Sequence, residues 1–163
     1  MTPAAELLAG EAIALLTARG QTVAVAESLT GGLAAAALTS VPGSSAVFVG
    51  AIVAYASRLK VALLGVPSDL LTAHGPVHQD VAIAMARGVR DRLGATYGLA
   101  TTGVAGPGPS DGRPAGTVFV AVSGPAGCPV QELVLAGDRP QVRDGAVRAV
   151  LSLLLTNLPE DIS

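Results

Sequence analysis

The chain has 163 residues, half of them hydrophobic, and its ten basic and twelve acidic side chains give a net charge of −2. This length fits one domain with a full apolar core, so residues 1–163 are expected to form a single domain. The even charge balance, with two Phe, two Tyr and no Trp, argues against nucleic-acid binding, which uses basic faces and stacking rings.

Compartment and membrane contact can also be predicted from the sequence. Glu11, Arg19 and Gly20 interrupt the first apolar segment, which therefore resembles neither a signal peptide nor a membrane span. Cys128 has no second cysteine to pair with, which suits a reducing compartment. We expect a cytoplasmic protein with no membrane partner.

The first half of the chain alternates between helical and strand patterns. Apolar periodicity and turn residues predict, in order, a helix over 3–18, a strand over 22–26, a helix over 31–40, a strand over 47–54 and short helices over 58–64 and 68–73.

The second half adds a long helix, three strands and a closing helix. The predicted ranges are 79–94 for the helix, 98–102, 116–123 and 130–135 for the strands, and 139–157 for the last helix. The last two strands follow each other directly and form an expected antiparallel hairpin. The pattern predicts a three-layer α/β/α sandwich on a mixed, mostly parallel five-stranded sheet.

Ser28 lies in a strand–turn–helix unit, within the run Glu27-Ser28-Leu29-Thr30-Gly31-Gly32. The end of a strand in an open α/β sheet is a common ligand site, and the N–H groups of the next helix could hold an oxyanion or a phosphate. The alternative is that Ser28 and Thr30 only cap that helix.

Lys60 is the single lysine of the chain, while the other nine basic residues are arginines. Partial burial lowers the pKa of a lysine toward the range of a general base, whereas arginine does not lose its proton. Arg58 adds a positive charge that is expected to lower this pKa further. The alternative for Lys60 is a solvated helix residue.

A second serine competes for the role of nucleophile. Ser57 and Lys60 match the S-x-x-K spacing of penicillin-recognising enzymes, but the companion S-D-N and K-T-G motifs are missing. We therefore favour Ser28 over Ser57.

Two further segments could bind a ligand. The Gly/Pro-rich loop after Thr102 could cup an anion with its N–H groups, but this signal is weak by itself and a simple Gly-Pro turn is the default interpretation. Arg139 and Arg143 share one face at the start of the last helix, behind a capping-box pair of Asp138 and Gln141. Their alternatives are solvated arginines.

A metal site is not expected. His74 and His78 have H-x3-H spacing, but Gly75-Pro76 interrupts any helix between them and the sequence shows no third ligand nearby. No cofactor is expected either.

The ordered motifs resemble the CinA C-terminal domain family, which includes bacterial nicotinamide-nucleotide amidohydrolase. The resemblance covers roughly residues 5–157. Its strongest matches are Ala26-Glu27-Ser28-Leu29-Thr30-Gly31-Gly32, Pro42-Gly43-Ser44-Ser45, Leu64-Gly65-Val66, Thr102-Gly103-Val104-Ala105-Gly106-Pro107, Pro114-Ala115-Gly116-Thr117-Val118 and Gly137-Asp138-Arg139.

The resemblance implies a homodimer that hydrolyses the carboxamide of nicotinamide mononucleotide to the acid and ammonia without a metal. It assigns the nucleophile to Ser28 and the base to Lys60, with Tyr55 assisting. The implied substrate-binding residues are Thr30, Gly31, Gly32, Thr102, Gly103, Ala105, Gly106, Arg139 and Arg143. The alternative is a non-catalytic protein of the same fold that binds a nucleotide or a partner.

Overall fold

The computed structural model describes residues 2–158. The elements follow the chain in the order α1 (Pro3–Arg19), β1 (Val23–Glu27), α2 (Leu33–Thr39), a short 3-10 turn (Ser44–Ala46), β2 (Phe48–Val53), α3 (Ser57–Leu64), α4 (Ser68–His74), α5 (Gln79–Leu93), β3 (Tyr97–Gly103), β4 (Thr117–Ser123), β5 (Val130–Val134) and α6 (Arg139–Asn157). Every helix and strand that the sequence predicted is present, with ends shifted by two residues or fewer.

The five strands form one mixed sheet in the order β2-β1-β3-β4-β5. Strand β1 runs parallel to β2 and β3, and β4 runs antiparallel to β3 and β5. The predicted five-stranded mixed sheet is confirmed, including the β4–β5 hairpin. The β3–β4 pair was not anticipated as antiparallel. It arises because the chain between these strands contains no helix that could carry out a parallel crossover.

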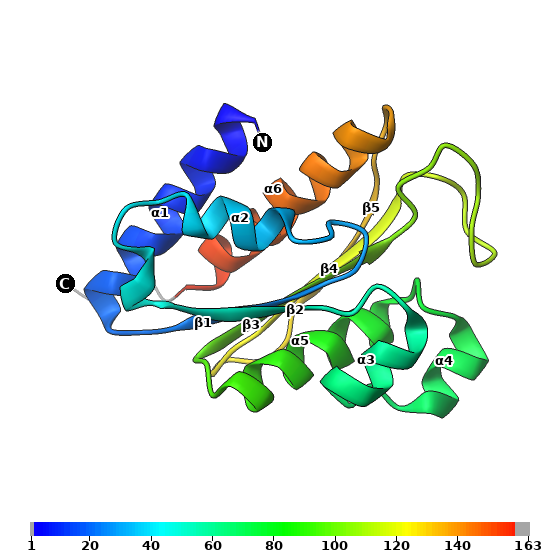
Figure 1. Cartoon of the computed structure of the whole chain (residues 1–163), viewed down its shortest axis with the longest axis horizontal. Coiled ribbons are helices and arrows are strands. Elements are labelled where there is room, and N and C mark those ends of the chain that lie inside the picture. The colour runs from blue at the N-terminus through cyan, green and yellow to red at the C-terminus, as the bar shows by residue number, and fades with distance from the viewer. Residues whose placement is uncertain (1, 159–163) are drawn as a thin grey trace.

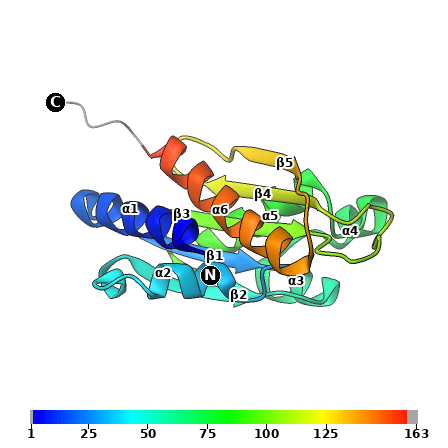
Figure 2. The same ribbon diagram turned by 90° about the horizontal axis from the view of Figure 1, so that it is seen from above.

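Helices cover both faces of the sheet. Figures 1 and 2 show α1, α2 and α6 on one face, and Figure 1 shows α3, α4 and α5 on the other. Side chains of β1 alternate between the two layers: Val23 and Val25 pack with the first group of helices, and Ala24 and Ala26 with the second. This alternation is the two-residue period of a strand buried on both faces.

Small residues let α5 pack unusually close to its neighbours. A Cβ atom on Gly88 would lie 1.9 Å from the backbone oxygen of Leu64 at the end of α3, and one on Gly98 would lie 2.1 Å from the backbone oxygen of Ala86. Because only glycine fits at these contacts, Gly88 lets α5 pack closely against the end of α3, and Gly98 lets it pack closely against β3.

The parallel strands end at one edge of the sheet. Glu27 at the end of β1 is paired with Val53 at the end of β2 and with Thr101 in β3. The residues that follow these strands therefore emerge side by side, and they build the site described next.

Candidate active site

Glu27 fixes the turn that holds Ser28. Its buried carboxylate accepts hydrogen bonds from the backbone N–H groups of Gly32 at 2.8 Å, Ala34 at 3.2 Å and Ala35 at 2.8 Å. A carboxylate at this place satisfies the free N–H groups at the start of α2 and complements the helix dipole. Glu27, rather than Ser28 or Thr30, is therefore the side chain that caps α2, and the capping alternative for those two residues is wrong.

The turn leaves two backbone donors without a partner. The Gly31 N–H donates to the Ser28 carbonyl oxygen at 3.1 Å, and the Gly32 N–H is held by Glu27. Within the described residues, the N–H groups of Leu29 and Thr30 form no hydrogen bond. The N–H groups of Gly31 and Gly32 are thus engaged within the turn itself, whereas those of Leu29 and Thr30 are not.

Lys60 reaches Ser28 from the first turns of α3. Its Nζ lies 3.0 Å from the Ser28 Oγ, 2.8 Å from the Ala54 carbonyl oxygen and 3.3 Å from the Tyr55 carbonyl oxygen. Only 1% of Lys60 and 9% of Ser28 are exposed. When the amine is neutral, the two carbonyl groups can accept its two N–H bonds, which leaves its lone pair facing the Ser28 hydroxyl.

Burial makes Lys60 easier to deprotonate. Its pKa falls from 10.5 to about 8, mainly because the buried ammonium loses its hydration, while the negative charge of Asp111 acts in the opposite direction. Arg58, whose charge was expected to lower this pKa, is not among the causes. An amine with this pKa is partly neutral near neutral pH and can accept a proton.

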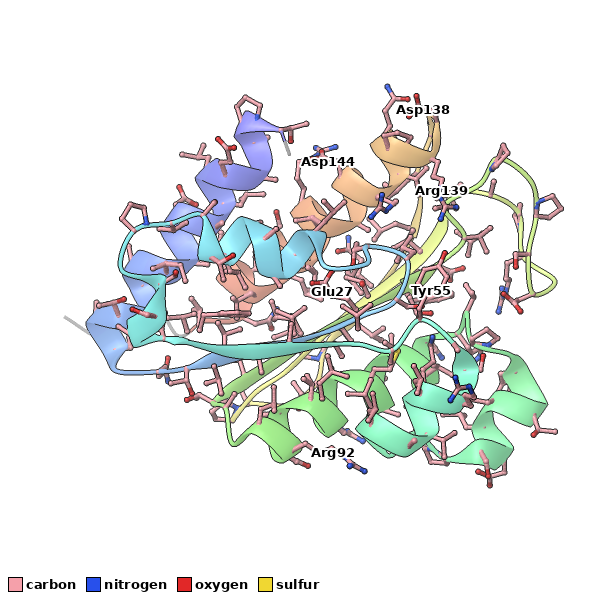
Figure 3. The ribbon with its side chains drawn as sticks, in the orientation of Figure 1. Glu27, Tyr55, Arg92, Asp138, Arg139 and Asp144 are labelled. Carbon is pink, nitrogen blue, oxygen red and sulfur yellow. The ribbon has the colours of Figure 1, made fainter. Side chains whose placement is uncertain are left out.

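Tyr55 and Arg139 meet at the entrance of the site. Tyr55 is 60% exposed, and its hydroxyl oxygen accepts a hydrogen bond from the Arg139 Nη2 at 3.2 Å. The Arg139 Nη1 donates to the Gly106 carbonyl oxygen at 2.9 Å. Figure 3 labels both side chains, Tyr55 in the segment between β2 and α3 and Arg139 at the first residue of α6. The Tyr55 hydroxyl forms no hydrogen bond with Lys60 or Ser28, so its link to the base is through its backbone carbonyl.

Arg143 braces the serine turn from α6. Its Nε donates to the Leu29 carbonyl oxygen and its Nη2 to the Thr30 carbonyl oxygen, both at 2.9 Å. It lies outside the lining of the pocket beside Ser28. The structure thus places Arg143 on the turn that carries the nucleophile rather than on the space where a substrate would lie.

A pocket of about 500 Å³ opens in front of Ser28. It is walled by the serine turn, by the start of α3 and by the loop between β3 and β4. Its lining consists of Ser28, Leu29, Tyr55, Ala56, Ser57, Lys60, Pro76, Val77, Thr102, Gly103, Val104, Ala105, Gly106, Pro107, Gly108, Pro109, Ser110, Asp111 and Arg139. This size is typical of pockets that bind small molecules.

The end of β3 supplies the back wall of this pocket. The Thr102 Oγ1 donates to the Pro76 carbonyl oxygen at 2.7 Å, which ties the wall to the segment before α5. A Cβ atom on Gly103 would lie 2.6 Å from the Thr117 carbonyl oxygen, so the backbone can pass here only without a side chain. Thr102, Gly103, Ala105 and Gly106 all line the pocket, as the substrate-binding prediction requires.

Asp80 lies beside His74 and His78, as a third residue that could bind a metal ion. Ligand atoms of the two histidines and Asp80 lie within 4.8 Å of one another. The two rings stack with centroids 4.1 Å apart, and the His78 Nδ1 accepts the Asp80 N–H at 3.2 Å as the cap of α5. Asp80 thus contradicts the prediction that these histidines have no third ligand nearby. The lone pair used for the cap and the positive end of the helix dipole still disfavour a cation here.

The structure brings most of the predicted residues to one place. Ser28, Tyr55, Lys60, Arg139 and the loop from Thr102 to Gly106 share one pocket. Two contributors were not predicted: Glu27, which caps α2, and Asp111, the carboxylate of the loop. The capping role of Glu27 could have been predicted, because an acidic side chain shortly before the start of a helix is a common N-terminal cap.

The fold and the site define a class: an α/β protein with a buried serine–lysine pair at the carboxyl edge of its parallel strands. This class can be compared with known protein families. Over residues 5–158 the sequence matches the CinA C-terminal domain, and the chain belongs to that family.

Relatives in sequence and structure agree with this assignment. The chain is 52% identical over 155 residues to a CinA-like protein of Frankia casuarinae, covering 93% of this chain and 36% of that protein. It is 48% identical over 158 residues to a CinA-like protein of Myxococcus xanthus, covering 94% and 37%. It thus spans about a third of the length of these curated relatives.

Solved structures show the same fold along nearly the whole chain. The competence/damage inducible protein CihA from Agrobacterium tumefaciens superposes with a TM-score of 0.92 at 37% identity, covering 96% of each chain. A CinA superfamily protein from Escherichia coli superposes with a TM-score of 0.91 at 33% identity, covering 94% of this chain and 90% of that one. Within the described residues, no helix is long and apolar enough to cross a membrane.

Proposed function

We propose that this domain hydrolyses the carboxamide of nicotinamide mononucleotide to nicotinate mononucleotide and ammonia, with Ser28 as nucleophile and Lys60 as general base. The observation that carries the proposal is the 3.0 Å contact between the Lys60 Nζ and the Ser28 Oγ. Both side chains are buried, and both line the pocket. A serine hydroxyl needs such a base because it is a weak nucleophile by itself.

The first half of the reaction uses the pair and the turn around it. Neutral Lys60 takes the Ser28 proton while the Ser28 Oγ bonds to the amide carbon, and the amide oxygen becomes an oxyanion. The unpartnered N–H group of Leu29, a residue that lines the pocket beside Ser28, is the donor that we assign to that oxyanion. Protonated Lys60 then gives the proton to the amide nitrogen, the carbon–nitrogen bond breaks, and ammonia leaves an ester on Ser28.

The second half regenerates the enzyme. Neutral Lys60 takes a proton from water, the resulting hydroxide attacks the ester carbon, and the proton returns to the Ser28 Oγ as the nicotinate product leaves. The Arg139 guanidinium and the loop from Thr102 to Gly106 line the same pocket and offer donors for the ribose and phosphate. A homodimer and a cytoplasmic location remain predictions of the sequence.

The test is ammonia release from nicotinamide mononucleotide, with two serine variants compared. Ser28→Ala is expected to lower kcat at least about a thousandfold, because no other group replaces the nucleophile. Ser57→Ala is the matched control: this serine also lines the pocket, but it has no hydrogen bond to Lys60, and its variant is expected to keep most of the activity. The rate should rise with pH through about 8 as Lys60 becomes neutral.

Two outcomes would contradict the proposal. Full activity of Ser28→Ala would remove Ser28 from the chemistry. Measurable nucleotide binding by the unsubstituted chain without any ammonia release would instead favour the alternative, a non-catalytic nucleotide-binding protein on the same fold.

A further inference from the structure

The pocket carries charges of both signs. Among its lining residues, Lys60 and Arg139 are the only cationic side chains and Asp111 is the only carboxylate. Asp111 belongs to the loop between β3 and β4, which the catalytic proposal uses only up to Gly106. A lone carboxylate in a pocket assigned to an anionic nucleotide needs an explanation, because it repels the phosphate.

Backbone geometry alone offers one explanation. Asp111 has φ of +52° and Gly112 has φ of +71°, and the flanking residues Ser110 and Arg113 exchange backbone hydrogen bonds of 3.0 Å and 2.9 Å. A two-residue turn with positive φ at both positions strongly favours Asp-Gly or Asn-Gly. The turn therefore accounts for a small polar residue at this position, but it does not distinguish a charged Asp from a neutral Asn.

The charge of Asp111 is available to a ligand. One carboxylate oxygen accepts the Ser110 hydroxyl at 2.9 Å, and within the described residues Asp111 forms no ion pair. Its field reaches the amine beside Ser28, where it raises the pKa of Lys60 and so opposes the burial that makes Lys60 a base. Since the charge works against the base, catalysis by Lys60 gives no reason for it either.

Substrate chemistry supplies the missing reason. A nicotinamide nucleotide has a fixed positive charge on the pyridinium ring that bears the carboxamide, and a phosphate at its other end. With the carboxamide at Ser28, the ring would lie in the pocket that Lys60 and Asp111 both line, and the phosphate could reach Arg139, which lines the same pocket. The two opposite charges of the pocket then match the two opposite charges of one ligand.

We propose that Asp111 is a specificity-determining residue whose carboxylate pairs with the cationic pyridinium ring of the substrate. This inference rests on the proposed function, and it deepens it: the domain selects the oxidised, cationic nucleotide over the reduced dihydropyridine form, whose ring is neutral. Both forms have the same carboxamide, ribose and phosphate, so the ring charge is the main electrostatic difference between them.

Binding measurements on a non-reacting background test this inference. Isothermal titration calorimetry would compare oxidised and reduced nicotinamide mononucleotide on Ser28→Ala and on Ser28→Ala combined with Asp111→Asn. Asparagine suits the same turn, so the second substitution removes the charge and keeps the loop. A partly exposed charge pair predicts that Asp111→Asn lowers the ratio of the affinity for the oxidised form to the affinity for the reduced form about 3- to 5-fold, whereas the lost repulsion of the phosphate acts on both forms and cancels in this ratio. Asp69→Asn in α4, outside the pocket lining, is the matched control and should change neither.

The outcomes separate this inference from the proposed function. An equal change for both forms, or no change for either, overturns the role of Asp111, and so does a failure of the oxidised form to bind at all. Because binding does not require turnover, these results hold whether or not the unsubstituted chain releases ammonia. Ammonia release with an unchanged binding ratio would retain the proposed function and reject only the inference about Asp111.

Discussion

Lys60→Met replaces a buried ammonium with an uncharged side chain of similar shape, and the effect on stability depends on pH in a direction that can be worked out. In the folded chain the pKa of Lys60 is about 8, against 10.5 for a free lysine. Each pH unit between these values corresponds to about 1.4 kcal/mol, so burying the protonated amine costs about 3 kcal/mol below pH 8.

The direction of the change follows from which state holds the proton. Below the folded pKa both states are protonated, and the folded state carries the whole penalty. As pH rises from about 8 toward 10.5, the folded chain has released the proton and the unfolded chain has not, so the free energy of unfolding increases with pH. Above 10.5 neither state is protonated and the penalty is gone.

Urea denaturation at about pH 7 and about pH 10, for both proteins, measures this effect. Relative to Lys60→Met, the unsubstituted chain is expected to gain about 2–3 kcal/mol between the two conditions. Burial raises the pKa of the Cys128 thiol, which acts in the opposite direction, but the thiol is present in both proteins and cancels in the comparison. Because Lys60 is the only lysine, NMR of lysine-labelled protein also reports its pKa as one signal.

A difference in stability that is the same at both pH values would refute this reasoning. It would mean that Lys60 keeps an ordinary pKa in the folded chain, and Lys60 would then be too rarely neutral near pH 7 to act as the base. The loss of hydrogen bonds to the Ala54 and Tyr55 carbonyl groups lowers the stability of Lys60→Met by an amount that does not change with pH, so it does not imitate the predicted effect.

Two further predictions concern the turn and the close packing. Arg143→Ala leaves two carbonyl groups of the serine turn without their donor; it should lower the free energy of unfolding by about 1–3 kcal/mol and lower kcat more than it raises KM. Arg148→Ala, which removes only an exposed ion pair on the same helix, should change stability by less than about 1 kcal/mol, and equal effects of the two would contradict a bracing role for Arg143. Gly88→Ala puts a Cβ atom 1.9 Å from the Leu64 oxygen and should cost about 2–3 kcal/mol in urea denaturation. Gly10 lies in α1, and a Cβ atom added there would meet nothing within 4 Å, so Gly10→Ala should raise the free energy of unfolding by about 0.5–1 kcal/mol. A similar result for both glycines would argue against the close packing at Gly88.

Much of the fold could be read from local patterns. The strands and helices lie where the periodicity placed them, and the predicted capping box of Asp138 and Gln141 is present at the start of α6. Such features depend on neighbours within a few residues, so the sequence contains all the information that defines them. The direction of β4 beside β3 was missed because a strand pattern does not say which neighbour the strand pairs with.

Some residues of the candidate site could likewise be identified from the sequence, and others could not. The order of the motifs indicated Ser28, Lys60 and Arg139, but the roles of Glu27, Arg143 and Asp111 depend on contacts between separate elements. Glu27 reaches forward onto the start of the next helix, and Arg143 crosses more than a hundred positions to the serine turn. No spacing rule links such residues.

The sequence by itself determined that a single lysine follows a strand and that a serine follows the strand before it. Only the tertiary structure decided that the two are 3.0 Å apart and that the amine is almost fully buried. The physical reason is that a pKa reflects the loss of water and the charges on every side, and these come from α3, β1, β2 and the loop of Asp111 packing together. Periodicity positions a residue along its own element, whereas packing between elements sets its chemistry.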